Sequence, residues 1–178
     1  IGARIATPGR NNDQQKIEKS VSVLGTVKTC QSPESIGNRN GCGKTTLLRD
    51  LAAQLAARRY RVAVVDERGE LFPPEAGFDT GPSTDIYTGC SKGQGIMMAL
   101  KTMGAQWIAV DEITEEKDLK ALLGAWGCGV RLLASAHASS LEDLENRYVY
   151  RSIKEMKVFD TIVILQPDKS YRLERIPL

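Results

Sequence analysis

The segment from Asn38 to Thr46, Asn-Arg-Asn-Gly-Cys-Gly-Lys-Thr-Thr, has residue types suited to binding nucleotide phosphates. It follows the P-loop pattern G-x-x-x-x-G-K-[ST], except that Asn38 stands at the first glycine position. Glycines without a Cβ let the backbone curl and direct its N–H groups at an anion. The pattern predicts that Lys44 contacts the β- and γ-phosphates of ATP and that the Thr45 hydroxyl ligates Mg²⁺. The predicted ATP-binding residues are Asn38, Arg39, Asn40, Gly41, Cys42, Gly43, Lys44, Thr45 and Thr46.

Two features of this segment depart from the pattern. Asn38 replaces a glycine, although asparagine tolerates a left-handed backbone better than most residues. The preceding stretch, Gln31 to Ile36, is polar and contains Pro33, which suits a central strand poorly. These departures support one alternative, a degenerate P-loop module that binds nucleotide or nothing and serves as a scaffold.

Two adjacent carboxylates follow an apolar run at Trp107 to Val110, as in a Walker B element. The run predicts a buried strand, and its end brings Asp111 and Glu112 to the edge where ligands bind in open α/β sheets. Asp111 is predicted to hold the Mg²⁺ through water, beside Thr45. Glu112 is predicted to act as the catalytic base that polarises the attacking water.

Other strand ends carry further candidates. His137, the single histidine of the chain, ends the run Ser-Ala-His and is predicted to sense the γ-phosphate or the attacking water. Glu67 or Glu70 could assist the metal site, and Arg68 could reach a neighbouring subunit's phosphate as an arginine finger. Arg147 and Arg151 are also finger candidates, although a charged helical face explains them equally well. Solvated charge and a loop histidine without a role are the alternatives for this group.

Alternation of helical and strand patterns predicts an α/β fold with a mainly parallel central sheet, helices on both faces and a C-terminal hairpin. The expected helices span 44–59, a segment around 96–103, a segment from 115 to about 126 capped by Thr114, and a segment beginning near Leu141 after a Ser139–Glu142 capping box. The expected strands are 61–65, 107–110 and 130–134, and the hairpin joins 161–165 to 171–176.

Two regions fall outside this regular pattern. Residues 1–35 read as an N-terminal arm or the remnant of a preceding element, in which only 21–27 alternates like a strand, at an edge. Residues 36–178 are predicted to form the ATPase domain. Within it, residues 70–90 contain several prolines and glycines and are expected to form a long loop.

Composition narrows the class of protein. The 178 residues suit one domain, and 42% hydrophobic with 26% charged residues is ordinary for a globular chain. A net charge of +2 and 6% aromatic residues weaken the case for a nucleic-acid binder. No apolar run approaches the roughly 18 residues of a spanning helix. The four cysteines are scattered without a C-x-x-C pair, which favours free thiols over a metal site or disulfide framework.

Several phrases, in order, resemble the stage III sporulation protein AA family of ATPases, related to secretion-type ring ATPases. They are residues 41–51, 64–70, 81–85, 108–113 and 134–137. The combination of Asp66 to Glu70 with Gly81 to Asp85 is the most specific part. The resemblance covers about residues 37 to 165 and implies a RecA-like fold, ATP and Mg²⁺ as ligands, and a hexameric ring.

The same resemblance implies membrane-embedded sporulation channel proteins as partners, and a location at the cytoplasmic face of the membrane in the mother cell of a spore former. It assigns Lys44 and Thr45 to the nucleotide site, Asp111 and Glu112 to the hydrolytic site, and His137 to the sensor. A nucleic-acid translocase or helicase loader on the same core is the rival enzyme. It needs a basic, aromatic-bearing surface, and its hydrolysis would respond to single-stranded DNA.

Overall fold

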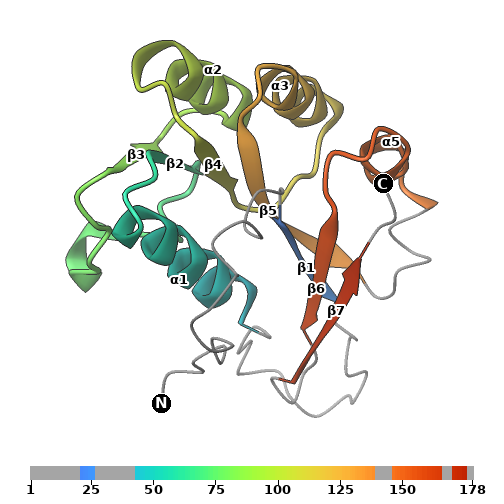
Figure 1. The fold of residues 1–178 in the computed structure, drawn as a ribbon, viewed down its shortest axis with the longest axis horizontal. Coiled ribbons are helices and arrows are strands. Elements are labelled where there is room, and N and C mark those ends of the chain that lie inside the picture. The colour runs from blue at the N-terminus through green and yellow to red at the C-terminus, as the bar shows by residue number, and fades with distance from the viewer. Residues whose placement is uncertain (1–20, 27–42, 139–145, 166–169, 176–178) are drawn as a thin grey trace, which may run out of the picture.

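The computed structural model describes residues 21–26, 43–138, 146–165 and 170–175 of the chain. A sheet with strand order β3-β2-β4-β5-β1-β6-β7 crosses the molecule (Figure 1). Its strands are β1 (Val21–Thr26), β2 (Val62–Asp66), β3 (Thr84–Thr88), β4 (Trp107–Val110), β5 (Arg131–Ala138), β6 (Thr161–Leu165) and β7 (Tyr171–Arg175). All neighbouring strands are parallel except the β6–β7 hairpin, which is antiparallel.

Four α-helices are described, together with a short 3₁₀ helix at Pro74–Ala76. They are α1 (Lys44–Ala57), α2 (Lys92–Thr102), α3 (Glu116–Gly127) and α5 (Tyr148–Glu155). Figure 1 shows α1 on one side of the sheet and α2, α3 and α5 on the other. This arrangement confirms the predicted α/β fold, with helices on both faces and a C-terminal hairpin.

Alternation along the central strands divides the core into two layers. Val62 and Val64 of β2 pack in the cluster that contains Leu48 and Ala52 of α1. Ala63 and Val65 pack on the opposite face, in the cluster that holds residues of α2, α3 and α5. Successive strand side chains point to opposite faces, so a strand covered on both sides must be apolar throughout. The continuous run Val-Ala-Val-Val of β2 is buried for this reason.

The first strand corrects one expectation from the sequence. Residues 21–27 were expected to lie in an arm or at an edge, but β1 lies between β5 and β6 and is parallel to both. The edge assignment for this segment is therefore wrong. The division of the chain at residue 35 stays a prediction.

Three further expectations need correction. The expected long loop at 70–90 contains β3, an edge strand paired with β2. β5 extends to Ala138, so Ser135 and His137 lie within the strand. The helix expected to be capped by Thr114 begins at Glu116 with Glu115 as its N-cap. The capping box at Ser139 and Glu142 lies outside the described residues.

Candidate functional site

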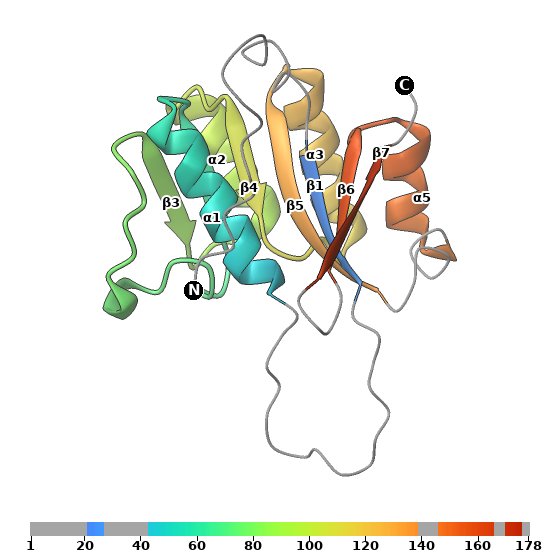
Figure 2. The same ribbon diagram turned by 60° about the horizontal axis from the view of Figure 1, so that its bottom comes forward.

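One edge of the sheet brings together the carboxyl ends of its parallel strands. Figure 2 shows this edge at the bottom, where β4 passes into the turn before α3 and where α1 begins. Because each crossover returns through a helix, the amino ends of α1 and α2 lie at the same edge. Ligands of open α/β sheets bind at such an edge.

The amino end of α1 carries the described half of the predicted phosphate loop. Gly43 is the N-cap of α1 and has a left-handed backbone, with φ 95° and ψ 12°. Its carbonyl accepts the first helical hydrogen bond from the Leu47 N–H at 2.9 Å. Lys44, Thr45 and Thr46 form the first turn, where unpaired N–H groups and the helix dipole favour an anion. Asn38, Arg39, Asn40, Gly41 and Cys42 lie outside the described residues.

The turn after β4 is held by a serine from the neighbouring strand. Ser135 is fully buried in β5, and its hydroxyl donates to Asp111 Oδ1 at 2.6 Å. The Ser135 hydroxyl oxygen also accepts the Glu112 N–H at 3.0 Å, and the Ser135 carbonyl accepts the Ile113 N–H at 3.2 Å. Ser135 therefore fixes both carboxylate-bearing residues from one position. Ser135 was singled out only as part of the Ser-Ala-His run, without this role.

Glu112 has an unusual backbone. Its φ is +40°, in the left-handed region that costs a non-glycine residue about 1–2 kcal/mol. Residues held in such conformations cluster at functional sites. They persist only where contacts with the surrounding structure overcome the strain. The Ser135 hydrogen bond supplies part of that constraint. Both Asp111 and Glu112 stay partly exposed, so their free oxygens remain accessible to a ligand.

Tyr150 of α5 supports the same turn from the face of the sheet that α2 and α3 cover. Its hydroxyl donates a hydrogen bond to the carbonyl of Ile113, and its side chain is 8% exposed. Burial raises the pKa of Tyr150, and the negative charges of Glu112 and Asp118 raise it further, while Arg147 lowers it. The hydroxyl consequently stays a donor across the physiological range.

The turn after β2 has a different construction. Asp66 is 1% exposed, and its carboxylate accepts the N–H groups of Glu70, Leu71 and Phe72 at 2.9, 2.8 and 3.1 Å. This aspartate folds the turn and has a structural role. The turn leaves Arg68 and Glu67 exposed at the surface.

Arg49 of α1 fastens this turn to the helix that begins with Lys44. Its guanidinium donates to the carbonyls of Leu71 and Glu70 and lies 3.9 Å from the centre of the Phe78 ring. Desolvation lowers the pKa of Arg49, and the charge of Asp66 opposes that shift. No sequence pattern had singled out Arg49, since its role depends on contacts 21 and 22 residues away.

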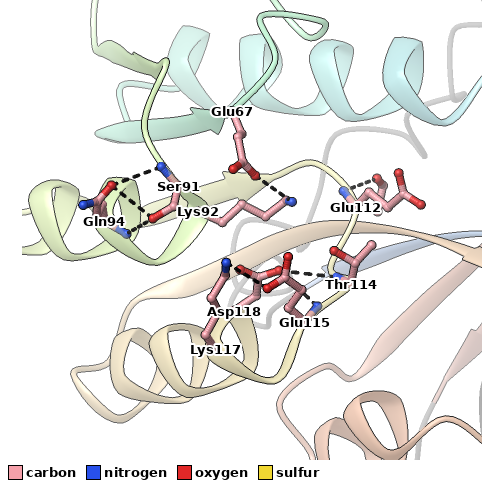
Figure 3. A network of polar contacts seen from close by, with 10 residues as sticks. Glu67, Ser91, Lys92, Gln94, Glu112, Thr114, Glu115, Lys117 and Asp118 are labelled. Atoms are coloured by element: carbon pink, nitrogen blue, oxygen red, sulfur yellow. Dashed lines mark hydrogen bonds and ion pairs between the residues drawn. The ribbon is translucent and has the colours of Figure 1, made fainter.

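Polar contacts gather at the amino ends of α2 and α3 near this edge (Figure 3). Lys92, the first residue of α2, forms an ion pair with Glu67 at 3.0 Å. Asp118 is buried and accepts the Glu115 N–H at 3.2 Å, completing the cap of α3. Lys117, bonded to Glu115 at 2.8 Å, lowers the pKa of Glu115, and the charge of Lys92 adds to that effect.

The remaining predicted residues are placed only in part. His137 belongs to β5, where its backbone is in register with Gly25 of β1, and its side chain is not described. Arg147 and Arg151 are exposed at the start of α5. Within the described ranges, no group of three His, Cys, Asp or Glu side chains is arranged to hold a metal ion. In that same part of the chain, no helix is long and apolar enough to span a membrane.

The parallel sheet, with helices on both faces, forms a RecA-like α/β domain, the fold found in secretion ATPases. The chain belongs to the family described as "Sporulation stage III, protein AA", whose model matches residues 23–173. The match confirms the family resemblance drawn from the sequence phrases.

Two curated relatives extend this assignment. Stage III sporulation protein AA of Bacillus subtilis (strain 168) is 35% identical over 135 residues, covering 71% of this chain and 44% of the relative. Uncharacterized protein ycf45 of Cyanidium caldarium is 27% identical over 162 residues, covering 86% of this chain and 48% of the relative. The chain therefore spans less than half the length of these relatives.

Solved structures of secretion and pilus motors share the fold. The VirB11 ATPase from the Brucella suis type IV secretion system has a TM-score of 0.55 at 20% identity, covering 83% of this chain and 43% of that one. The pilus retraction motor PilT with bound ADP has a TM-score of 0.61 at 14% identity, covering 92% and 51%. At these identities the likeness establishes the fold alone.

Proposed function

We propose that this domain hydrolyses ATP to ADP and phosphate with Mg²⁺, and that hydrolysis drives a membrane-associated sporulation channel or secretion assembly. One observation carries the proposal: the glycine-capped amino end of α1 and the strained Asp111–Glu112 turn lie at the same edge of the parallel sheet. A positive helix end suits phosphates, and a fixed pair of carboxylates suits a hydrated cation and a water nucleophile.

Each residue takes a role that its position allows. Lys44 and the first-turn N–H groups of α1 would bind the β- and γ-phosphates, and Thr45 would hold Mg²⁺. Asp111, oriented by Ser135, would help to hold the same ion through water. Bound Mg²⁺ supplies charge neutralisation at the phosphates.

The Glu112 carboxylate accepts a proton from the attacking water as the bond from that oxygen to the γ-phosphorus forms and the bond to the β–γ bridging oxygen breaks. ADP leaves with the bridging oxygen. His137 is assigned to sense the γ-phosphate. Asn38 to Cys42 complete the phosphate loop in this proposal.

The working form is proposed to be a hexameric ring attached to membrane-embedded sporulation channel proteins at the cytoplasmic face of the mother-cell membrane. Family membership supports both the ring and the setting. Arg68 is the trans-acting finger in this proposal, because it is exposed on a turn that Asp66 and Arg49 hold rigid. Such a finger contributes on the order of 10³–10⁵ in rate, so an isolated monomer hydrolyses ATP weakly.

Two substitutions test the proposal. Lys44→Ala is expected to abolish binding of a fluorescent ATP analogue, since it removes the cation at the phosphates. Glu112→Gln is expected to keep binding within about twofold and to reduce phosphate release at least about 100-fold, the lower range for a general base. Lys101→Ala, on the exposed last turn of α2, is the matched control and leaves both unchanged.

Three outcomes would redirect the assignment. Normal turnover by Glu112→Gln would remove Glu112 from its role. No hydrolysis by the assembled wild-type protein at millimolar Mg²⁺ would favour the scaffold alternative. Strong stimulation by single-stranded DNA would favour the translocase.

A further inference from the structure

Lys92 stands where local rules disfavour a lysine. It is the first residue of α2, and a cation at a helix amino end opposes the helix dipole. Its side chain is only 14% exposed, whereas lysine is rarely buried unless it is paired. Violations of local preference that persist in a folded protein point to function or strain.

Close packing fixes the position of Lys92. Gly95, one turn further along α2, packs on β2: a Cβ built there would lie 2.6 Å from Val65 Cγ1. The capping box of Ser91 and Gln94 sets the first turn of the helix. α2 is therefore seated on β2, and Lys92 meets Glu67, which follows the end of that strand, at 3.0 Å.

The surroundings of Lys92 are rich in carboxylates. Figure 3 shows the lysine side chain running from the start of α2, beneath Glu67, toward the turn at Glu112. Glu115 is within its electrostatic reach, since the charge of Lys92 lowers the pKa of that residue. Lys117, the other lysine labelled in Figure 3, forms an ion pair with Glu115 and is exposed to solvent. Lys92 differs from it, because its side chain is largely shielded from solvent between the loops that follow β2 and β4.

We infer that Lys92 is a built-in counter-ion, a positioning residue that holds Glu67 and keeps divalent cations from the acidic edge until nucleotide phosphates bring one in. The inference deepens the ATPase proposal and rests on it for the role of the cation. Binding of the divalent cation then depends on bound nucleotide, so the site holds no metal ion between turnovers.

A binding measurement without nucleotide tests the inference directly. Mn²⁺ binding is followed by electron paramagnetic resonance on wild type, Lys92→Met, and Lys92→Met combined with Glu67→Gln. Removing the ammonium leaves Glu67 without its partner, so Lys92→Met is expected to bind Mn²⁺ at least about 10-fold more tightly than wild type, on the scale of a removed neighbouring charge. The double variant is expected to lose that gain, because Glu67 carries it.

Matched controls separate this role from a general charge effect. Lys120→Met removes an ammonium that pairs with Glu116 at 3.4 Å on exposed α3, and should leave Mn²⁺ binding unchanged. Lys92→Arg keeps the charge and should bind Mn²⁺ as wild type does. Equal Mn²⁺ binding by wild type and Lys92→Met would overturn the inference, as would a gain that survives Glu67→Gln.

Turnover provides a second readout. Lys92→Met and Glu67→Gln are expected to lower kcat by similar factors, on the order of 10-fold, with little change in KM, and to be no worse together. Additive losses would mean that Lys92 acts independently of Glu67. If wild type fails to hydrolyse ATP, the ATPase proposal fails, while the nucleotide-free Mn²⁺ comparison still decides the counter-ion inference.

Discussion

The turns after β2 and β4 begin with the same residue type at neighbouring strand ends, yet their aspartates serve opposite purposes. Asp66 is buried, and three backbone N–H groups occupy its carboxylate. Asp111 is partly exposed, and within the described part of the chain the Ser135 hydroxyl alone donates a hydrogen bond to its carboxylate. A carboxylate whose oxygens already accept several backbone hydrogen bonds has little capacity to bind a ligand. A carboxylate that is oriented by one hydrogen bond keeps acceptor positions for a ligand.

The two turns also differ in backbone strain, which is low in the turn after β2 and higher in the turn after β4. The β2 turn places its left-handed residue at Gly69, with φ 70°, where glycine adopts the conformation without a steric cost. The β4 turn places Glu112 at φ 40°, where the side chain makes it costly. The first turn is built for stability, and the second keeps a carboxylate in place despite a local cost.

The largest expected effect falls on stability at Asp66. Asp66→Ala leaves two buried N–H groups and one partly buried N–H group without an acceptor, and should lower the free energy of unfolding by about 3 kcal/mol. Asp111→Ala should cost about 1 kcal/mol, because only the Ser135 hydroxyl loses its partner. Urea denaturation of both variants measures the difference. Equal losses at the two positions would erase the distinction between structural and ligand-facing aspartates.

The sequence predicted where the acidic turns lie at this edge of the sheet, but it did not predict the different roles of their aspartates. Apolar runs ending in acidic residues located both turns, because a strand buried on both faces must be continuously apolar. Nothing local distinguished Asp66 from Asp111. That distinction depends on Ser135, which lies 24 residues away in another strand, and on the path of the chain from Glu70 to Phe72.

The misplaced strand β1 and the missed strand β3 have a related explanation. β1 contains Gly25 and is followed by a polar segment, so its pattern suited an edge although it pairs on both sides. β3 is a true edge strand whose side chains are only partly buried or exposed, and it follows several turn-forming residues. Pairing between distant segments determined both strands, and it leaves a weak mark on local composition.

A smaller effect of opposite sign is expected at Glu112. Glycine relieves a left-handed strain of about 1–2 kcal/mol, but loses about 0.5–1 kcal/mol to greater freedom in the unfolded chain. Alanine retains the strain, so Glu112→Gly should be more stable than Glu112→Ala by about 0.5–1 kcal/mol in thermal or urea unfolding. At Lys120, an exposed position inside α3, the order should reverse because helices favour alanine. Alanine proving more stable at both positions would argue against strain at Glu112.

The last effect concerns the support of the β4 turn by Tyr150, and its pH dependence appears only at alkaline pH. The pKa of Tyr150 is raised in the folded protein, mainly by burial, so the folded state keeps its proton while the unfolded chain releases it above about pH 10. The stabilisation is therefore complete below that pH and declines as the pH rises, by at most about 1.4 kcal/mol per unit from this group. Tyr150→Phe should cost about 1 kcal/mol at pH 7, through the lost hydrogen bond to Ile113, and should show a shallower decline between pH 10 and 11.

Tyr148→Phe, on the exposed face of the same helix, is the control and should leave that slope unchanged. Parallel pH profiles for wild type and Tyr150→Phe would contradict the raised pKa of this hydroxyl, and equal stability of the two proteins at pH 7 would mean that its hydrogen bond to Ile113 does not hold the turn.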